Sequence, residues 1–278
     1  MIRPVTPAER KMKRRDFLLA SGVALAGWRL PSRIQPIGLQ LYTARTLMAR
    51  DMNGTLAAVA RIGYREVEFA GYFNRTPEQV RALLTDVGLS APASHVDFAS
   101  LERGWDETLE TAQAVGHRYV VVPWIPQDRR TLAGYRRVAQ LFERRGADAR
   151  AAGLVFAYHN HDFEFADVSG TTGYDILCEE TSAANVQMEM DLFWTVKGGR
   201  DPHAYFARYP GRFPLVHVKD MDAEGRMVDP GQGQMNFAAI VAARETAGIR
   251  HWFVEHDQPT DVMETLRRGH GLLQSLET

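Results

Sequence analysis

Short apolar runs alternate with longer segments of helical periodicity from residue 37 to the C-terminus. The apolar runs are rich in Val, Ile, Phe and Tyr, which is typical of strands that are buried on both faces. They predict strands near 37–42, 66–69, 90–95, 119–122, 154–161, 186–191, 213–219 and 250–256. The segments between them predict helices near 52–62, 77–87, 105–115, 132–152, 173–182, 202–208, 236–247 and 260–275.

Helix boundaries are marked by residues that cap or end helices. Thr76 and Pro77 suit the start of a helix, Asn236 suits the start of another, and Gly88 and Gly248 suit helix ends. Strands that alternate with helices pair in parallel.

The resulting prediction is an α/β fold, a single (β/α)8 TIM barrel over residues 34–278, a length close to the roughly 250 residues typical of that fold. A doubly wound open sheet is the competing fold, but residues 40–45 lack the glycine-rich first turn of its nucleotide site.

Polar residues end four successive predicted strands. They are His159, Asp191, His217 and Glu255. In a barrel these positions share one mouth, and two imidazoles with two carboxylates suit one divalent ion of Mn, Zn, Fe or Co. We therefore expect these four residues to bind a metal, with Glu189 supporting a ligand histidine from behind.

The same motifs carry a family resemblance. They are Gly38–Thr43, Gly63–Phe69, Tyr158–Asp162, Met190–Trp194, His217–Asp220 and Val254–His256. From Ile37 onwards the chain resembles the xylose isomerase-like barrel superfamily, the sugar phosphate isomerase/epimerase group. The resemblance implies a metal held by Glu, Asp, His and Glu. Asp191, His217 and Glu255 match the last three, whereas His159 stands where relatives have a glutamate.

The resemblance also implies a reaction class: a metal-dependent isomerase or epimerase that abstracts a proton next to a carbonyl of a carbohydrate or cyclitol. Relatives that are ketose epimerases use two glutamates as the acid/base pair, and this chain keeps only Glu255. The candidates for the second proton-transfer group are His161, Lys219, Glu68 and His95. A lyase or dehydratase acting on a keto sugar, keto-glycoside or inosose fits equally well.

Substrate contacts are expected from further residues at the strand ends: Gln40, Tyr42, His95, Trp124 and Trp194. The expected partner is a small carbohydrate, and the sequence leaves a homo-oligomer open. Two other classes share the barrel, a non-catalytic sugar-binding protein and an apurinic-site endonuclease. The formal net charge of −1 argues against a nucleic-acid partner, which favours a basic surface.

The N-terminus predicts export. Residues 11–15 are basic and include the pair Arg14-Arg15, an apolar run follows from Phe17, and residues 24–26 offer a cleavage site of small residues. This order resembles a twin-arginine signal. We expect residues 1–33 to be a signal peptide and linker, and the mature protein to be periplasmic and free of the membrane.

Two further features receive modest interpretations. Cys178, the one cysteine, is expected to be a small buried apolar residue. The glycine-rich segment 229–234 is either a plain loop or a backbone anion site.

Overall fold

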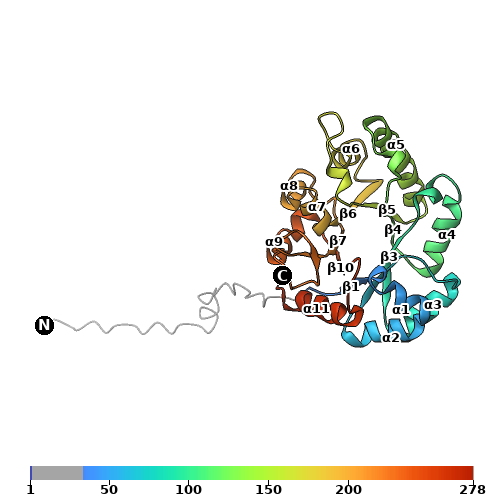
Figure 1. Ribbon diagram of the computed structural model, residues 1–278, viewed down its shortest axis with the longest axis vertical. Coiled ribbons are helices and arrows are strands. Elements are labelled where there is room, and N and C mark those ends of the chain that lie inside the picture. The colour runs from blue at the N-terminus through green and yellow to red at the C-terminus, as the bar shows by residue number, and fades with distance from the viewer. Residues whose placement is uncertain (2–33, 278) are drawn as a thin grey trace. The chain divides into compact units, whose positions relative to one another are not determined.

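The computed structural model describes Met1 and residues 34–277, and the latter contain a closed barrel of eight parallel strands. The strand order around the barrel is β1-β10-β7-β6-β5-β4-β3-β2. The barrel strands are β1 (Ile37–Gln40), β2 (Glu66–Phe69), β3 (Ser90–His95), β4 (Tyr119–Val122), β5 (Val155–His159), β6 (Val186–Asp191), β7 (Leu215–Val218) and β10 (His251–Val254). Figure 1 shows these strands in the middle of a ring of helices. The predicted (β/α)8 barrel is confirmed.

Helices connect the strands and cover the barrel. They are α1 (Arg45–Arg50), α2 (Met52–Ile62), α3 (Pro77–Val87), α4 (Trp105–Val115), α5 (Leu132–Ala151), α6 (Gly173–Glu179), α7 (Leu192–Lys197), α8 (Pro202–Arg208), α9 (Phe237–Ala242), α10 (Arg244–Ala247) and α11 (Val262–Ser275). Short 3-10 turns lie at η1 (Leu41–Ala44), η2 (Phe98–Leu101), η3 (Gln127–Arg129) and η4 (Phe163–Phe165). A small antiparallel hairpin pairs β8 (Asp220–Met221) with β9 (Met227–Val228). The sequence did not predict α1, α7 or this hairpin.

The predicted helix caps are present. The Thr76 hydroxyl accepts a hydrogen bond from Gln79 N, and the Gln79 side chain accepts one from Thr76 N, which completes a capping box ahead of Pro77. Gly88 ends the helix with a φ of 69°, a left-handed conformation that glycine adopts without steric cost. Asn236 caps α9 through its side chain, which accepts from Ala239 N.

The apolar residues form two cores. The larger core lies between the strands and the helices, whereas a second cluster of buried side chains comprises Ala93, Tyr119, Val121, Ala157, Leu215 and Phe253. In β4, β5, β7 and β10 these residues alternate with residues of the larger core, so they fill the inside of the barrel. A Cβ at Gly38 would lie 2.5 Å from a Phe253 ring carbon, so glycine makes room for that ring. Apolar side chains therefore fill the barrel interior below the polar residues at the carboxyl ends of the strands.

Several strands end earlier than predicted. β1 ends at Gln40, which places Tyr42 in a 3-10 turn, and β5 ends at His159, which places His161 in the following loop. Cys178 is buried and unpaired, as expected. Among the described helices, none combines the length and the apolarity needed to cross a bilayer. The predicted signal segment, residues 1–33, lies outside the described residues apart from Met1.

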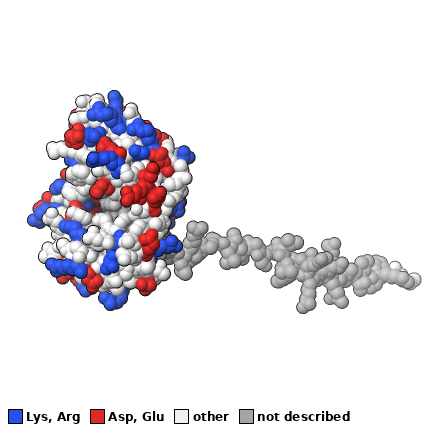
Figure 2. Space-filling model, turned by 90° about the vertical axis from the view of Figure 1, so that its right-hand side faces the viewer, with Lys and Arg blue, Asp and Glu red and all other residues white. Residues whose placement is uncertain are grey.

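Acidic and basic side chains are interspersed over the barrel surface that faces the viewer in Figure 2. That face carries no continuous basic area of the kind that tracks a nucleic-acid backbone.

Candidate metal centre

A deep cleft opens at the carboxyl ends of the barrel strands. Its volume is about 880 Å³, and its lining includes His95, His159, His161, Lys219 and Glu255. Active sites of this fold lie at the same end of the barrel, because the loops after the strands gather there. The cleft is therefore where the predicted site should be sought.

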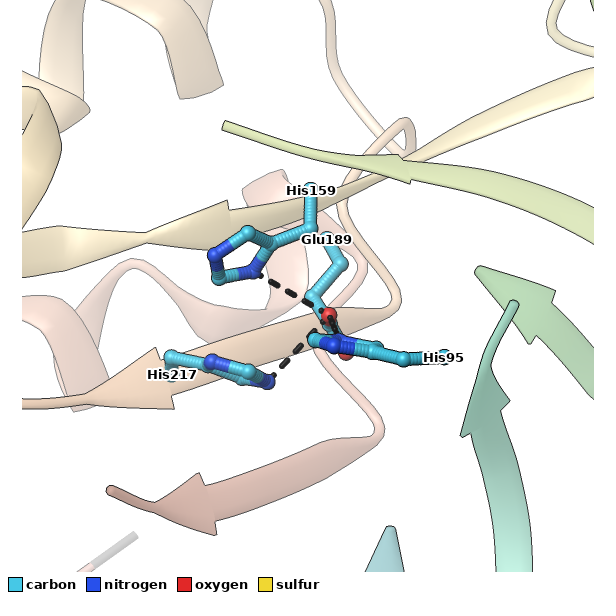
Figure 3. Close-up of side chains that lie close together, drawn as sticks. All are labelled: His95, His159, Glu189 and His217. Atoms are coloured by element: carbon cyan, nitrogen blue, oxygen red, sulfur yellow. Dashed lines mark hydrogen bonds and ion pairs between the residues drawn. The ribbon is translucent and has the colours of Figure 1, made fainter. Parts of the chain in front are cut away.

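Four side chains converge around one carboxylate oxygen below the cleft. Glu189 Oε2 lies 2.8 Å from His95 Nε2, 3.2 Å from His159 Nδ1 and 3.2 Å from His217 Nε2. Figure 3 shows the three imidazoles arranged around this carboxylate. Three nitrogens and one carboxylate oxygen within 4.8 Å of one another form a candidate metal site.

Asp191, His217 and Glu255 form a second candidate group, which shares His217 with the first. Glu255 Oε2 lies 2.6 Å from His217 Nδ1, and Asp191 Oδ2 lies 3.9 Å from the same nitrogen. His159 Nε2 approaches to 3.8 Å from Asp191 Oδ2. The four residues predicted from the strand ends thus lie together, with His159 contributing one nitrogen toward each group.

A buried ammonium group lies against this second set. Lys219 Nζ is 3.0 Å from Asp191 Oδ2, 2.9 Å from Glu255 Oε2 and 2.6 Å from Asp257 Oδ1. Sequence reasoning missed Asp257, which follows Glu255 by two residues and so had the same-face spacing that singled out His161 and Lys219.

Side-chain amides and hydroxyls fix the ends of β5 and β6. Asn160 accepts a hydrogen bond from Asp191 N at 3.1 Å through Oδ1 and donates to Thr195 Oγ1 at 3.1 Å through Nδ2. Asp191 Oδ1 accepts from Trp194 N at 2.8 Å and so caps α7. Asp191 Oδ2 is left to face the cluster, which explains why asparagine and aspartate occupy these two positions.

Gln40 and Glu68 are among the predicted residues that do not line the cleft. Gln40 is fully buried, and its amide is used internally: Nε2 donates to Glu68 Oε2 at 2.7 Å, and Oε1 accepts from Tyr42 N at 2.9 Å. Gln40 does not line the cleft, and a contact between Gln40 and a substrate stays a prediction. Glu68 is also fully buried and lies 2.7 Å from His217 Nε2, so it supports that histidine rather than facing a substrate.

The other residues predicted to contact substrate differ in whether they line the cleft. Tyr42, Trp124 and His95 line the cleft. Trp194 is not among its lining residues and packs behind His161, with 5.5 Å between the ring centroids. The sequence could not separate these cases, because strand period gives the face of a strand and not the depth in the barrel.

The buried histidines differ in charge. Burial, and then the neighbouring His217, lower the pKa of His159 well below its usual value. Burial and the nearby Lys219 lower the pKa of His161 to about 3. For His217 burial acts in the same direction, but the carboxylates of Glu189 and Glu255 outweigh it and raise the pKa well above the usual value. His159 and His161 are therefore neutral imidazoles, whose free nitrogen can take a metal or a proton.

Burial and neighbouring positive charges also have opposite effects on the pKa values of the carboxylates. Burial raises the pKa of Asp191 to about 6, against the pull of Lys219. Burial would also raise the pKa of Glu255, but Lys219 and His217 outweigh it and hold that pKa well below its usual range. Glu255 is thus an ionised carboxylate at the cleft.

The donor set fits a divalent cation. Glu68 Oε1 and Glu189 Oε1 are buried atoms without a hydrogen-bond partner among the described residues, whereas His159 Nδ1 and Asp191 Oδ2 lie in ion-pair contact with Glu189 and Lys219, respectively. Glu68, Glu189, Asp191 and Glu255 are four buried carboxylates, and among the described residues Lys219, His217 and His95 are the positively charged or readily protonated groups paired with them. Uncompensated buried charge is costly, so a metal held by these histidines and carboxylates would satisfy both the open atoms and the excess negative charge.

The glycine-rich loop after β9 does not provide a free anion site. The Asp220 carboxylate already accepts hydrogen bonds from the amides of Gly231, Gly233 and Met235 at 2.9–3.1 Å. These amides are saturated by the chain itself, so the plain-loop interpretation of residues 229–234 is the better one.

Comparisons with known proteins agree with this geometry. Residues 56–276 match the family model described as Xylose isomerase-like TIM barrel. An inosose dehydratase of Lacticaseibacillus casei is 29% identical over 138 residues, which cover 43% of this chain and 46% of the relative. The chain therefore spans less than half the length of that relative in the match. An inosose dehydratase of Geobacillus kaustophilus (strain HTA426) is 23% identical over 243 residues, which cover 72% and 77%.

A solved structure supports the same assignment. The sugar phosphate isomerase/epimerase from Parabacteroides distasonis ATCC 8503 is 26% identical, with a TM-score of 0.74 over 86% of this chain and 93% of that one. The matched family model covers most of the barrel, from α2 to the end of α11. The chain belongs to the xylose isomerase-like TIM barrel family.

Proposed function

We propose that this protein is a divalent-metal-dependent enzyme that abstracts a proton next to a carbonyl of a carbohydrate or cyclitol, with isomerisation or epimerisation as the outcome. The observation that carries the proposal is the convergence of His159, Asp191, His217 and Glu255 at the base of one cleft. Open buried donor atoms and excess carboxylate charge support a metal there. When bound, the metal would polarise the substrate carbonyl and stabilise negative charge on its oxygen.

The residues at the cleft suit the proton transfers. Glu255 lines the cleft and is ionised beside Lys219 and His217, so its position and its charge allow it to take a proton from a substrate bound there. His161 lines it too, and its backbone amide donates to Glu164 Oε2 at 2.9 Å, which fixes the start of the loop. His161 is neutral, so its free ring nitrogen can accept a hydrogen bond from a substrate hydroxyl, while the Lys219 ammonium can donate a hydrogen bond to a substrate oxygen.

Dehydration is a second candidate, and two observations favour it. Both curated relatives described above are named inosose dehydratases. The glutamate expected on β5 is replaced by His159, so Glu255 lacks the partner glutamate of a two-glutamate epimerase. In a dehydration, the base takes the proton beside the carbonyl and the neighbouring hydroxyl leaves as water after gaining a proton, a donation for which the Lys219 ammonium is the candidate.

One experiment separates the two reactions. The protein is purified, its metal content is measured by elemental analysis, and it is incubated in D2O with inosose and with keto sugars in the presence of that metal. An isomerase or epimerase introduces solvent deuterium beside the carbonyl without loss of water. A dehydratase forms a product that is lighter by one water and has a conjugated ultraviolet absorption. A protein that binds no metal after reconstitution contradicts the proposal.

A further inference from the structure

The cleft extends well beyond the metal centre. The candidate ligands come from β3, β5, β6, β7 and the end of β10, yet the cleft wall also includes residues of η2, of α4 and of the turn between them: Ser100, Arg103, Gly104, Glu107, Thr108 and Thr111. In Figure 1 α4 lies on the opposite side of the helix ring from α8 and α9, which flank β7 in the chain. The cleft therefore crosses the barrel mouth from the metal centre to the wall formed by α4.

The volume of the cleft exceeds what one sugar ring needs. Pockets of about 300–1,000 Å³ enclose drug-sized ligands, which have two or more rings. The value of about 880 Å³ lies near the upper end of that range. A single keto sugar or cyclitol at the metal centre would leave the α4 side of the cleft filled with water.

Two exposed aromatic side chains line the same cleft. Tyr42 is 42% exposed and Trp124 is 47% exposed, and within the described chain they are the large apolar side chains with the greatest exposure apart from Met1. They follow β1 and β4, so they stand on either side of β2 and β3 at the mouth. Exposed aromatic rings in a concave site mark a binding surface rather than a core.

Each of these rings is held from one side by an arginine. The Arg45 guanidinium lies 4.1 Å from the Tyr42 ring centroid, and the Arg130 guanidinium lies 4.3 Å from a Trp124 ring centroid. Such cation–π contacts orient the ring, and the Trp124 ring also has edge-to-face contacts with His161 and Phe163. Since both rings line the cleft and remain more than 40% exposed, their exposed parts can contact the C–H face of a sugar.

The α4 wall supplies free polar groups. Arg103 and Glu107 are exposed, and in the described part of the chain neither has an ion-pair partner. Thr108 Oγ1 donates to Gly104 O at 2.9 Å and keeps its lone pairs for a further donor. Hydroxyl groups of a second sugar would find both donors and acceptors here.

We propose that the α4 side of the cleft is a second sugar subsite, and that the substrate is a two-ring carbohydrate whose keto ring binds at the metal centre and whose second ring lies between Tyr42, Trp124 and α4. This inference rests on the proposed function for the role of the metal end. The subsite itself rests on the cleft, the aromatic rings and the polar wall.

The test compares two probes that share the reacting ring. One is a 3-keto-hexose, and the other is the same 3-keto-hexose with a second hexose at its anomeric carbon. The metal-loaded enzyme is expected to have a kcat/KM at least about tenfold higher on the two-ring probe. Thr108→Trp fills the subsite and should lower that value by about tenfold or more, while kcat/KM on the single-ring probe stays within about twofold.

A matched variant and a binding assay complete the design. Glu110→Trp adds the same ring to an exposed position of α4 outside the cleft, so both probes should be processed as by the unchanged protein. If Thr108→Trp fails to fold by circular dichroism, Arg103→Ala tests the same wall at an exposed position and should weaken only the two-ring probe. Calorimetric titration with the non-reacting disaccharide lactose and with galactose gives a readout independent of turnover.

The outcomes separate this inference from the proposed function. Turnover of neither probe, with lactose binding that Thr108→Trp abolishes, contradicts the reaction and supports the subsite. Equal kcat/KM on both probes, or equal effects of Thr108→Trp on both, overturns the subsite and leaves the reaction standing.

Discussion

Replacing Lys219 by methionine should destabilise the metal-free protein strongly. The ammonium lies 2.6–3.0 Å from the carboxylates of Asp257, Glu255 and Asp191, and it is buried. Removing one partner of a buried ion pair costs about 3–5 kcal/mol, because the other charge is left uncompensated. In a domain of this size 1 kcal/mol shifts Tm by about 2–4 °C, so the loss should be about 6–20 °C in EDTA.

A divalent cation should reverse much of this loss. The Lys219 ammonium occupies the space beside two of the proposed ligands, Asp191 and Glu255, so it repels a metal there. Lys219→Met removes that repulsion, and we expect the variant to bind Mn²⁺ or Zn²⁺ about tenfold more tightly than the unchanged protein. At the same metal concentration the variant should therefore gain more in Tm.

The assay is thermal unfolding in EDTA and across a metal titration, followed by calorimetric titration of metal into both proteins. Lys197→Met is the matched control, because Lys197 is exposed and, among residues 34–277, donates to Gly225 O alone. The control should shift Tm by about 1–2 °C at most, as expected for surface substitutions within about 0.5 kcal/mol. Equal stability of Lys219→Met and the control in EDTA would refute the reasoning from buried charge. An unchanged metal affinity would refute the argument that the Lys219 ammonium repels a metal bound to Asp191 and Glu255.

Three further predictions concern catalysis, packing and pH. Glu255→Gln should lower kcat by about 100-fold or more while circular dichroism shows an intact fold; unchanged turnover on a confirmed substrate would remove Glu255 from the chemistry. Gly146→Ala should cost about 1–3 kcal/mol in urea unfolding, because its Cβ would lie 2.1 Å from Asn185 O, whereas Gly271→Ala meets open space and should gain about 0.5–1 kcal/mol; the same sign for both would contradict the packing argument. Burial lowers the pKa of His117 to about 4, so the stabilisation due to the neutral imidazole is complete above pH 6.5 and is lost as the pH falls toward 4. The variant His117→Asn should therefore lose up to about 3 kcal/mol less stability on acidification. An identical dependence of unfolding free energy on pH in both proteins would contradict this prediction.

The fold could be predicted because local signals and the barrel agree. The run Tyr119–Val122 is apolar throughout, since both faces of its strand are covered, and its bounds match the structure. The missed helix α7 shows where local signals fail. It begins directly after β6, its sequence Leu192–Lys197 contains aromatic and β-branched residues, and its start depends on the Asp191 side chain. Asp191 is a favoured N-cap residue, but the sequence interpretation assigned it to the strand end and to the metal, so the start of a helix was missed.

The site could be predicted only in part. The sequence shows which side chains of a strand point into the barrel, but it does not show how far along the barrel axis each of them lies. Glu189 and Asp191 share a face of β6, but two residues separate them by about 6.6 Å along the strand. Asp191 is level with His217 in the register, whereas Glu189 is level with Leu215, one layer deeper. Sequence spacing identified the inward face. The register between strands, which sets the depth, follows from the closed barrel as a whole.

His217 belongs to both candidate metal groups, but it cannot bind a metal in both groups at the same time. Its Nδ1 faces Glu255 and Asp191, and its Nε2 faces Glu68 and Glu189. A neutral imidazole offers one lone pair, so a metal on one nitrogen leaves the other as an N–H donor to the opposite carboxylates. The set His159, Asp191, His217 and Glu255 and the set His95, His159, Glu189 and His217 are therefore alternatives for a single ion. Lys219 contacts only the first set, so a metal affinity that rises when Lys219 is removed assigns the ion to Nδ1.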